Sequence, residues 1–232
     1  DMGYDINYDF IPKSAYGNPA LVKQYQDSYK STFIPDGSST TPNGLWLFEY
    51  AYDADKAVAG YPLRYMPPSG SVGVTADLYS EDHITVPKDG YLIVNHSLSA
   101  ANSPGDDVTI YSLLMDVRVN SNSDWRSLFN SNYNASNDGE LYIKGGTKIG
   151  MRGTYSDDVI TLGQWHRVVF TYNANTSTAK VYIDGALATT HSSVSQSTYG
   201  LYSTESGSPL LLLFGDDDGD SDIIDLKAAA LY

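Results

Sequence analysis

The 232-residue chain contains no cysteine. It therefore has no disulfide framework, no thiolate metal site and no cysteine nucleophile. No stretch approaches the ~18 consecutive apolar residues that a membrane-spanning helix needs. Basic residues are few, because 14 Lys and Arg stand against 28 Asp and Glu and give a formal net charge of −14. Such a surface repels phosphate backbones and anionic membranes, so nucleic-acid binding is not expected.

Strand signals dominate what is present. Short runs of alternating or continuous apolar residues recur along the chain with turn signals between them. This pattern is typical of an antiparallel sandwich or jelly roll. A chain of this length is within the range of one large β domain with its own core.

The strongest strand signal lies in residues 163–191. Residues 165–172 alternate, and apolar groups occur on both of their faces. A polar loop follows, and residues 180–191 then form a hairpin about Asp184 and Gly185, since this pair favours a turn with positive φ at both central positions. We expect the first of these strands to lie inside a layered β structure.

The two ends of the main domain predict further pairing. Residues 45–50 read as its first strand, and residues 223–232 close the chain, with a pairing expected close to that first strand. Residues 82–87 and 91–94 predict a hairpin across the turn at residues 88–90.

The first 43 residues differ from the rest of the chain. Asn18 and Pro19 form a helix start, and apolar residues then recur at helical spacing. We expect an N-terminal arm or linker over residues 1–43, with a short helix near residues 19–30, and the main domain over residues 44–232.

Several motifs together resemble the laminin-G-like group of concanavalin A-type jelly rolls. One is a Gly-x-Trp-His-Arg-Val strand from Gly163, followed by a polar loop and the Tyr-Ile-Asp-Gly turn from Tyr182. Residues that fit the bacterial branch of the group are Trp125–Phe129, Asn137–Tyr142, Ile149, Gly150, Leu210–Asp218 and a final strand ending at Tyr232. The resemblance covers roughly residues 45–232. It implies an all-β, antiparallel concanavalin A-like jelly-roll sandwich, here with a short N-terminal arm containing one helix.

Recognisable catalytic patterns are missing. No serine lies in a Gly-x-Ser-x-Gly elbow. Glycosidases on related jelly rolls use carboxylates two residues apart on one strand, and no such run is found. The Gln-x-His pattern of jelly-roll lyases is also missing. His166 lies in a strand that is mainly structural in the resembling family, so we expect a packed or hydrogen-bonded histidine and no catalytic residues.

Carboxylates are concentrated in residues 215–222. Oxygen ligands on an irregular loop suit Ca²⁺, which would also relieve the repulsion between them. Aspartates at every second position from Asp216 resemble the start of an EF-hand loop. However, Ser221 stands at the sixth position, where an EF-hand has glycine, and Lys227 stands at the twelfth, where it has glutamate. The alternative is a solvated acidic turn. Some laminin-G and pentraxin relatives bind Ca²⁺ at a loop rim. If the fold is similar, Asp138 approaches the acidic segment and is a further candidate ligand. The candidate ligands are Asp138, Asp216, Asp217, Asp218, Asp220 and Asp222.

Aromatic residues beside polar ones mark possible sugar contacts. The apolar face of a sugar stacks on rings, and its hydroxyls need fixed donors and acceptors. Each ring alone is as compatible with packing as with binding, and the sequence does not show whether the rings meet. The candidate ligand-binding residues are Trp125, Tyr133, Asn134, Tyr155 and Asp157.

The combined features predict a non-catalytic, lectin-like carbohydrate-binding module of a secreted or surface-displayed bacterial protein. Its partner would be a polysaccharide or glycan, and Ca²⁺ is the candidate cofactor. One alternative is a structural or protein-interaction domain of a larger cell-surface protein, and a second is a divergent glycan-active enzyme. The chain shows no signal segment and does not begin with Met. We interpret it as a mature or truncated chain of an extracellular, cell-surface or periplasmic protein.

Overall fold

The structure is a computed structural model. The structure describes residues 32–33, 41–48, 57–68, 78–80, 82–99, 107–131, 139–202, 209–215 and 219–232. The backbone separates into two compact units, Asp1–Pro42 and Asn43–Tyr232. All the strands below belong to the second unit. The helix predicted near residues 19–30 lies outside the described residues.

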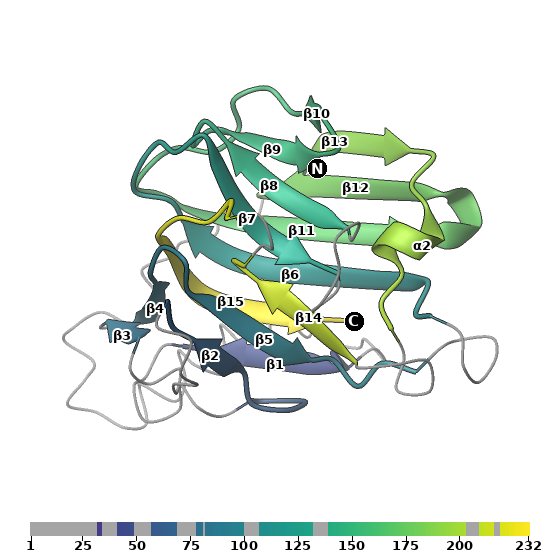
Figure 1. Cartoon of the computed structure of the whole chain (residues 1–232), viewed down its shortest axis with the longest axis horizontal. Helices are drawn as coiled ribbons and strands as arrows, with labels where there is room; N and C mark the ends of the chain where they lie inside the picture. The colour runs from purple at the N-terminus through teal and green to yellow at the C-terminus, as the bar shows by residue number, and fades with distance from the viewer. Residues whose placement is uncertain are drawn as a thin grey trace. The chain divides into compact units, whose positions relative to one another are not determined.

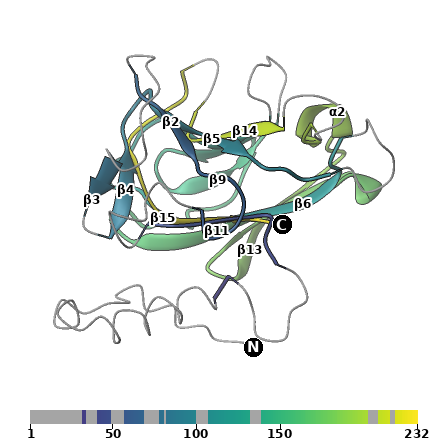
Figure 2. The same ribbon diagram turned by 90° about the horizontal axis from the view of Figure 1, so that it is seen from below.

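Two antiparallel sheets make up the described part of the second unit, and they face each other as two layers (Figures 1 and 2). The eight-stranded sheet has the order β13-β12-β11-β6-β15-β4-β3, and β1 pairs with β15. Its strands are β1 (Gly44–Leu47), β3 (Tyr79–Ser80), β4 (His83–Val86), β6 (Ile110–Arg118), β11 (Trp165–Asn173), β12 (Thr178–Ile183), β13 (Ala186–Ser192) and β15 (Ile224–Leu231).

The second sheet has seven strands in the order β10-β9-β8-β7-β14-β5-β2. Its strands are β2 (Arg64–Met66), β5 (Tyr91–Asn95), β7 (Trp125–Asn130), β8 (Glu140–Lys144), β9 (Lys148–Met151), β10 (Thr154–Tyr155) and β14 (Leu210–Leu213). This arrangement confirms the predicted all-β sandwich of the concanavalin A-like type.

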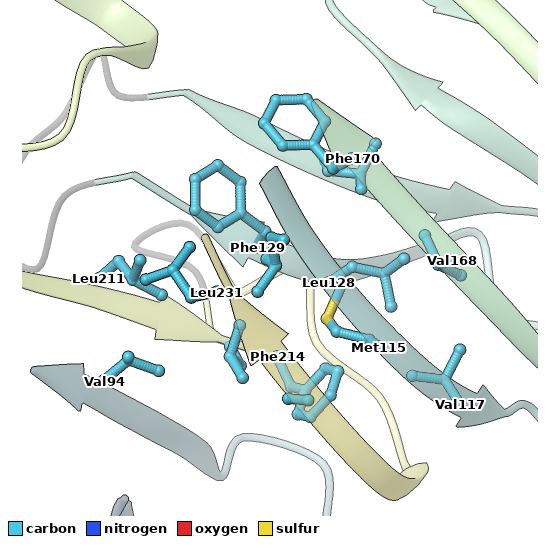
Figure 3. Packing of buried hydrophobic residues seen from close by; sticks show 14 of the residues in the cluster. Val94, Met115, Val117, Leu128, Phe129, Val168, Phe170, Leu211, Phe214 and Leu231 are labelled. Carbon is cyan, nitrogen blue, oxygen red and sulfur yellow. The ribbon is translucent and has the colours of Figure 1, made fainter. Parts of the chain in front are cut away.

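The core fills the space between the two sheets. Phe129 of β7 and Phe170 of β11 meet there with ring centroids 5.3 Å apart, and neither ring is exposed to solvent. Met115 and Val117 of β6 and Leu211 of β14 lie in the same cluster (Figure 3). Burying each such side chain contributes about 1.5–3 kcal/mol, so the sandwich is stabilised without a disulfide.

The meander over residues 163–191 is as predicted. β11 lies between β6 and β12, and its inward residues are buried while its outward ones are half-buried. Asp184 and Gly185 have φ values of 51° and 83°, the positive values that their two-residue turn requires. The last strand, β15, pairs with β1 as expected.

The predicted hairpin of residues 82–87 and 91–94 is wrong. β4 pairs with β15 and β3, whereas β5 pairs with β14 and β2, so the turn between them passes from one sheet to the other. Asp89 in this turn has a φ of 63°, and its backbone N–H donates to Ser221 Oγ over 2.9 Å. A local turn signal fixes a reversal of the chain, but long-range pairing decides whether the flanking strands hydrogen-bond to each other.

Residues 192–208 contain a short helix that the sequence pattern did not predict, α2 (Gln196–Tyr199). Tyr199 is buried between the layers, where its hydroxyl donates to the Glu140 carbonyl and its own carbonyl accepts from the Tyr111 hydroxyl. Tertiary contacts of one ring therefore hold a four-residue helix in place. In the described part of the chain, no helix is both long enough and apolar enough to span a membrane.

Candidate functional site

Three aromatic rings meet on the outer face of the seven-stranded sheet. The ring centroid of Trp125 lies 5.9 Å from that of Tyr142 and 5.6 Å from that of Tyr155, and both pairs are edge-to-face. The ammonium of Lys144 lies 4.5 Å from the Trp125 centroid and 5.0 Å from the Tyr155 centroid. Both geometries are favourable for aromatic and cation–π contacts. We call these four residues the ring platform.

Strand register brings the platform residues together. Trp125 of β7 pairs with Lys144 of β8. In the next row, Tyr142 of β8 and Tyr155 of β10 both pair with Gly150 of β9, which lies between them. Side chains alternate along a strand, and the neighbours of Tyr142 in β8 belong to the core, so Tyr142 and Lys144 point outward. Figure 1 shows β7 to β10 side by side.

Gly150 is needed for this arrangement. A Cβ added there would collide with the carbonyl oxygen of Thr154, and it would also crowd the Tyr155 backbone. The close approach of β9 and β10 therefore depends on a residue without a side chain. The backbone of β10 occupies the space that a side chain at residue 150 would take.

Charged groups surround the platform. Burial raises the pKa of Tyr155 above its ordinary value; a hydrogen bond to the Gly153 backbone opposes this shift, and the negative charges of Asp220 and Glu140 add to it. The backbone carbonyl of Asp220 accepts a 2.8 Å hydrogen bond from the N–H of Ser127, which places the end of the acidic segment beside β7. The platform thus combines flat apolar rings with acidic and basic groups.

The structure brings together two of the five predicted ligand-binding residues, Trp125 and Tyr155. Asp157 is exposed and follows Tyr155 by two residues. Tyr133 and Asn134 lie outside the described residues.

Sequence reasoning missed two platform residues, Tyr142 and Lys144. The alternation over residues 140–144 carried the necessary signal, because two aliphatic residues point inward and leave Tyr142 and Lys144 on the other face. The missing information was the register between β7 and β8.

In the acidic segment, Asp222 faces into the sandwich. Its Oδ2 accepts a 2.8 Å hydrogen bond from Nη2 of Arg126, whose side chain has no exposed surface, and its Oδ1 accepts from the Ile223 N–H. Burial lowers the pKa of Arg126, and the charge and hydrogen bond of Asp222 oppose that shift. Asp222 is therefore already neutralised by a protein cation.

Of the remaining carboxylates of the predicted calcium site, only that of Asp220 belongs to the described residues. Asp220 lies near Tyr155. Among the residues that the structure describes, no three His, Cys, Asp or Glu side chains are grouped so as to hold a metal ion. The other candidate ligands, Asp138, Asp216, Asp217 and Asp218, lie outside the described residues. The calcium site stays a prediction.

His166 is hydrogen-bonded at both ring nitrogens. Its Nε2 accepts from the N–H of Thr161 over 2.9 Å, and its Nδ1 lies 2.7 Å from Oδ2 of Asp184. The other oxygen of Asp184 accepts from the N–H of Arg167. Because both nitrogens are engaged, His166 fixes the start of β11 to the turn after β12, as expected for a structural histidine.

A second polar cluster lies on the eight-stranded sheet around Asp225, which is 2% exposed. Its carboxylate accepts hydrogen bonds from Thr85 Oγ1 and Asn120 Nδ2, both at 2.7 Å, and from Arg118 Nε at 2.9 Å. The guanidinium of Arg118 lies over the Trp165 ring, 4.7 Å from its centroid. These contacts satisfy a buried charge.

His83 extends this cluster to the surface. Its Nδ1 lies 2.9 Å from Oδ1 of Asp82, and its Nε2 lies 3.2 Å from Nη2 of Arg118. Burial would raise the pKa of Asp82, but hydrogen bonds from His83 and Lys227 and their positive charges outweigh burial, so this pKa lies well below its usual range. The groups of the cluster neutralise one another.

Solved structures of similar shape belong to binding domains and to enzymes. The binding domain of botulinum neurotoxin serotype D has a TM-score of 0.53 and 14% identity, over 82% of this chain and 47% of that chain. This chain therefore spans about half the length of that protein. Domain 4 of an extracellular arabinanase from Geobacillus stearothermophilus, solved with arabinotriose, has a TM-score of 0.51 and 14% identity, over 83% of this chain and 92% of that chain.

A third similar structure is Trypanosoma rangeli sialidase with the inhibitor DANA, with a TM-score of 0.50 and 12% identity, over 93% of this chain and 37% of that chain. At these identities the likeness shows the fold alone. No curated protein matches the sequence significantly. A family model described as the concanavalin A-like lectin/glucanases superfamily matches residues 82–223, more than half of the chain. The chain therefore belongs to the laminin-G-like family of the concanavalin A-like lectin/glucanases superfamily.

Proposed function

We propose that the chain is a non-catalytic carbohydrate-binding module and that the ring platform is its binding surface. The observation that carries the proposal is the convergence of Trp125, Tyr142 and Tyr155 on the outer face of one sheet. Trp125 and Tyr155 are only half-buried, so part of each ring faces solvent. Rings in this position offer stacking surface to the apolar face of a sugar.

Polar groups around the rings suit sugar hydroxyls. Glu140, Tyr142 and Lys144 alternate along β8 and share its outer face. Asp220 lies beside β7, where its backbone carbonyl accepts a hydrogen bond from the N–H of Ser127. All these residues lie on strands or are fixed to one by a backbone hydrogen bond, which reduces the ordering cost of binding.

The most deeply buried acidic groups in the described part of the chain have structural roles, which supports a role without catalysis. Asp116 has no exposed side-chain surface and binds Arg167 through two hydrogen bonds of 2.7 Å. Asp225 is held by Arg118 and its neighbours. A catalytic acid or base needs access to substrate, and these carboxylates face protein cations instead.

The similar structures support a glycan ligand and an extracellular location as parts of this proposal. The arabinanase domain was solved with arabinotriose and belongs to an extracellular enzyme. We accordingly assign this module to a secreted or surface-displayed bacterial protein, in which it would hold its chain on a polysaccharide.

A glycan array followed by calorimetric titration tests the proposal. Trp125→Ala and Tyr155→Ala are each expected to weaken binding of the best saccharide at least about tenfold, which is about 1.4 kcal/mol. Tyr182→Ala is the matched control, because Tyr182 is a half-buried tyrosine on the outer face of β12 in the other sheet. Absence of binding to any plant, host or bacterial polysaccharide, with or without Ca²⁺, would refute the function. Unchanged affinity in both ring variants would refute the site.

A further inference from the structure

Two lysines lie directly opposite each other at one side of the platform. Lys144 of β8 and Lys148 of β9 are cross-strand partners, and both are exposed. Like charges directly opposite each other on a sheet are destabilising. Neither lysine forms an ion pair with another described residue. The basic side chains that do contact an aspartate in the described chain are His83, Arg118, Arg126, His166, Arg167 and Lys227.

Register fixes where this pair lies relative to the rings. Trp125, Lys144 and Lys148 occupy one row across β7, β8 and β9. Neighbouring strands are about 4.8 Å apart, so the two stems are separated by about that distance. The ammonium of Lys144 is held above Trp125 and Tyr155. The row therefore presents two adjacent cations beside a stacking surface.

The acidic groups lie on the other side of the same surface. Glu140 is four residues before Lys144 on β8 and pairs with Asn130 of β7. Asp220 is fixed beside Ser127, in the row next to that of the lysines. A ligand on the rings thus meets cations on one side and carboxylates on the other, which gives the surface a polarity.

Resting on the proposed function, we propose that the platform binds an anionic saccharide. The sugar ring stacks on Trp125 and Tyr155, and a carboxylate or sulfate group on it accepts hydrogen bonds from Lys144 and Lys148. Bonds between an ammonium and such an anion are about twice as strong as neutral ones. The chain's net charge of −14 does not cancel this attraction, because exposed charges beyond about 8 Å are screened at physiological salt.

The test compares ligands that differ only in charge. Short oligogalacturonates and their methyl esters are titrated into the protein at physiological salt, and a sulfated disaccharide beside its unsulfated form distinguishes sulfate from carboxylate. We expect the charged form of at least one pair to bind about tenfold or more tightly. Lys144→Met with Lys148→Met should abolish that preference. Lys148→Met alone, which leaves the ring platform intact, should reduce the preference and leave affinity for the neutral form within about twofold. Lys180→Met, an exposed lysine on β12, should change neither.

Three other results are informative. Equal binding of the charged and neutral forms, with loss of both in Trp125→Ala, would overturn this inference and leave the proposed function intact. A charge preference that persists in the double lysine variant would also overturn it. If no member of the set binds, an array of neutral and acidic glycans decides, because binding of neutral glycans alone overturns the inference and binding of none overturns the function as well.

Discussion

The guanidinium of Arg126 and the carboxylate of Asp222 form an ion pair, 2.8 Å long, that joins β7 to the segment before β15. The Arg126 side chain has no exposed surface, and its Nε has no hydrogen-bond partner among the described residues. Asp222 is 20% exposed. The pair neutralises a cation that the sandwich has buried at the border of the acidic segment.

Removing one member of this pair should therefore be costly. Asp222→Ala leaves Arg126 buried without its counter-ion, and breaking such a pair destabilises a protein by about 3–5 kcal/mol. Arg126→Met replaces the cation with an apolar side chain and should cost less. The free energy of unfolding from urea denaturation measures both changes.

An exposed aspartate provides the control for these variants. Asp157→Ala should stay within about 0.5 kcal/mol of the wild type. The double variant Arg126→Met with Asp222→Ala should have about the same free energy of unfolding as Arg126→Met alone, because it retains no buried charge without a partner. A cost for Asp222→Ala as small as that of Asp157→Ala would contradict the account of the pair.

His96 should make folding sensitive to mild acid. It is 1% exposed, and its Nδ1 accepts a 3.0 Å hydrogen bond from the N–H of Leu98. Burial, opposed by a backbone hydrogen bond at Tyr202, lowers its pKa from 6.5 to about 4. Below pH 6.5 the unfolded chain binds the proton first, so stability falls as the pH drops from 6.5 towards 4. The loss should reach about 2 kcal/mol by about pH 5.

Urea denaturation between about pH 7.5 and pH 5 measures this effect. His96→Asn keeps an acceptor for Leu98 but cannot titrate, so its stability should vary less with pH by about 2 kcal/mol. Some dependence should remain, because burial and the nearby charge of Arg152 also lower the pKa of His191. Equal pH dependence in wild type and His96→Asn would show that His96 is not the group responsible.

Gly150→Ala should impair saccharide binding through the backbone. The added Cβ would collide with Thr154, so β10 must move away from β9 and Tyr155 must leave Trp125. Calorimetry should show binding weakened as strongly as by Tyr155→Ala. Gly163→Ala is the control, since its φ of +77° makes alanine strained but its Cβ meets open space. Gly163→Ala should lower stability by about 1 kcal/mol and preserve affinity; loss of affinity in both variants would point to general unfolding.

Calcium is expected to raise the melting temperature if the acidic segment binds it, because a ligand held only by the folded chain stabilises it. Since Asp222 already pairs with Arg126, Asp220→Asn is the informative variant among the described residues. It should reduce the rise produced by millimolar Ca²⁺. Identical melting curves with Ca²⁺ and with a chelator would end the calcium hypothesis.

Local patterns predicted the fold well where strands pair with their neighbours in sequence. The alternation of β11 and the Asp184–Gly185 turn determine the meander, because a period of two and a positive-φ turn are encoded locally. The turn between β4 and β5 was misread as a hairpin, since its strands find their partners far away in sequence.

The candidate site could be predicted only in part for the same reason. Trp125 and Tyr155 were identifiable as rings beside polar residues. Their contact depends on the alignment of β7 with β8 and on the alignment of β10 with Gly150 of β9. No local pattern determines either alignment. Tyr142 and Lys144 join the site through that register.

The chain has three tryptophans, and their indole N–H signals test the ring platform most directly. Trp46 is buried, and its Nε1 donates to the Tyr61 carbonyl. Trp165 lies with Arg118 on the other sheet. In nitrogen–proton NMR spectra assigned with single Trp→Phe variants, titration with the best saccharide should shift the Trp125 indole signal and leave those of Trp46 and Trp165 in place. A shift of the Trp165 signal with an unmoved Trp125 signal would contradict the ring platform as the binding surface.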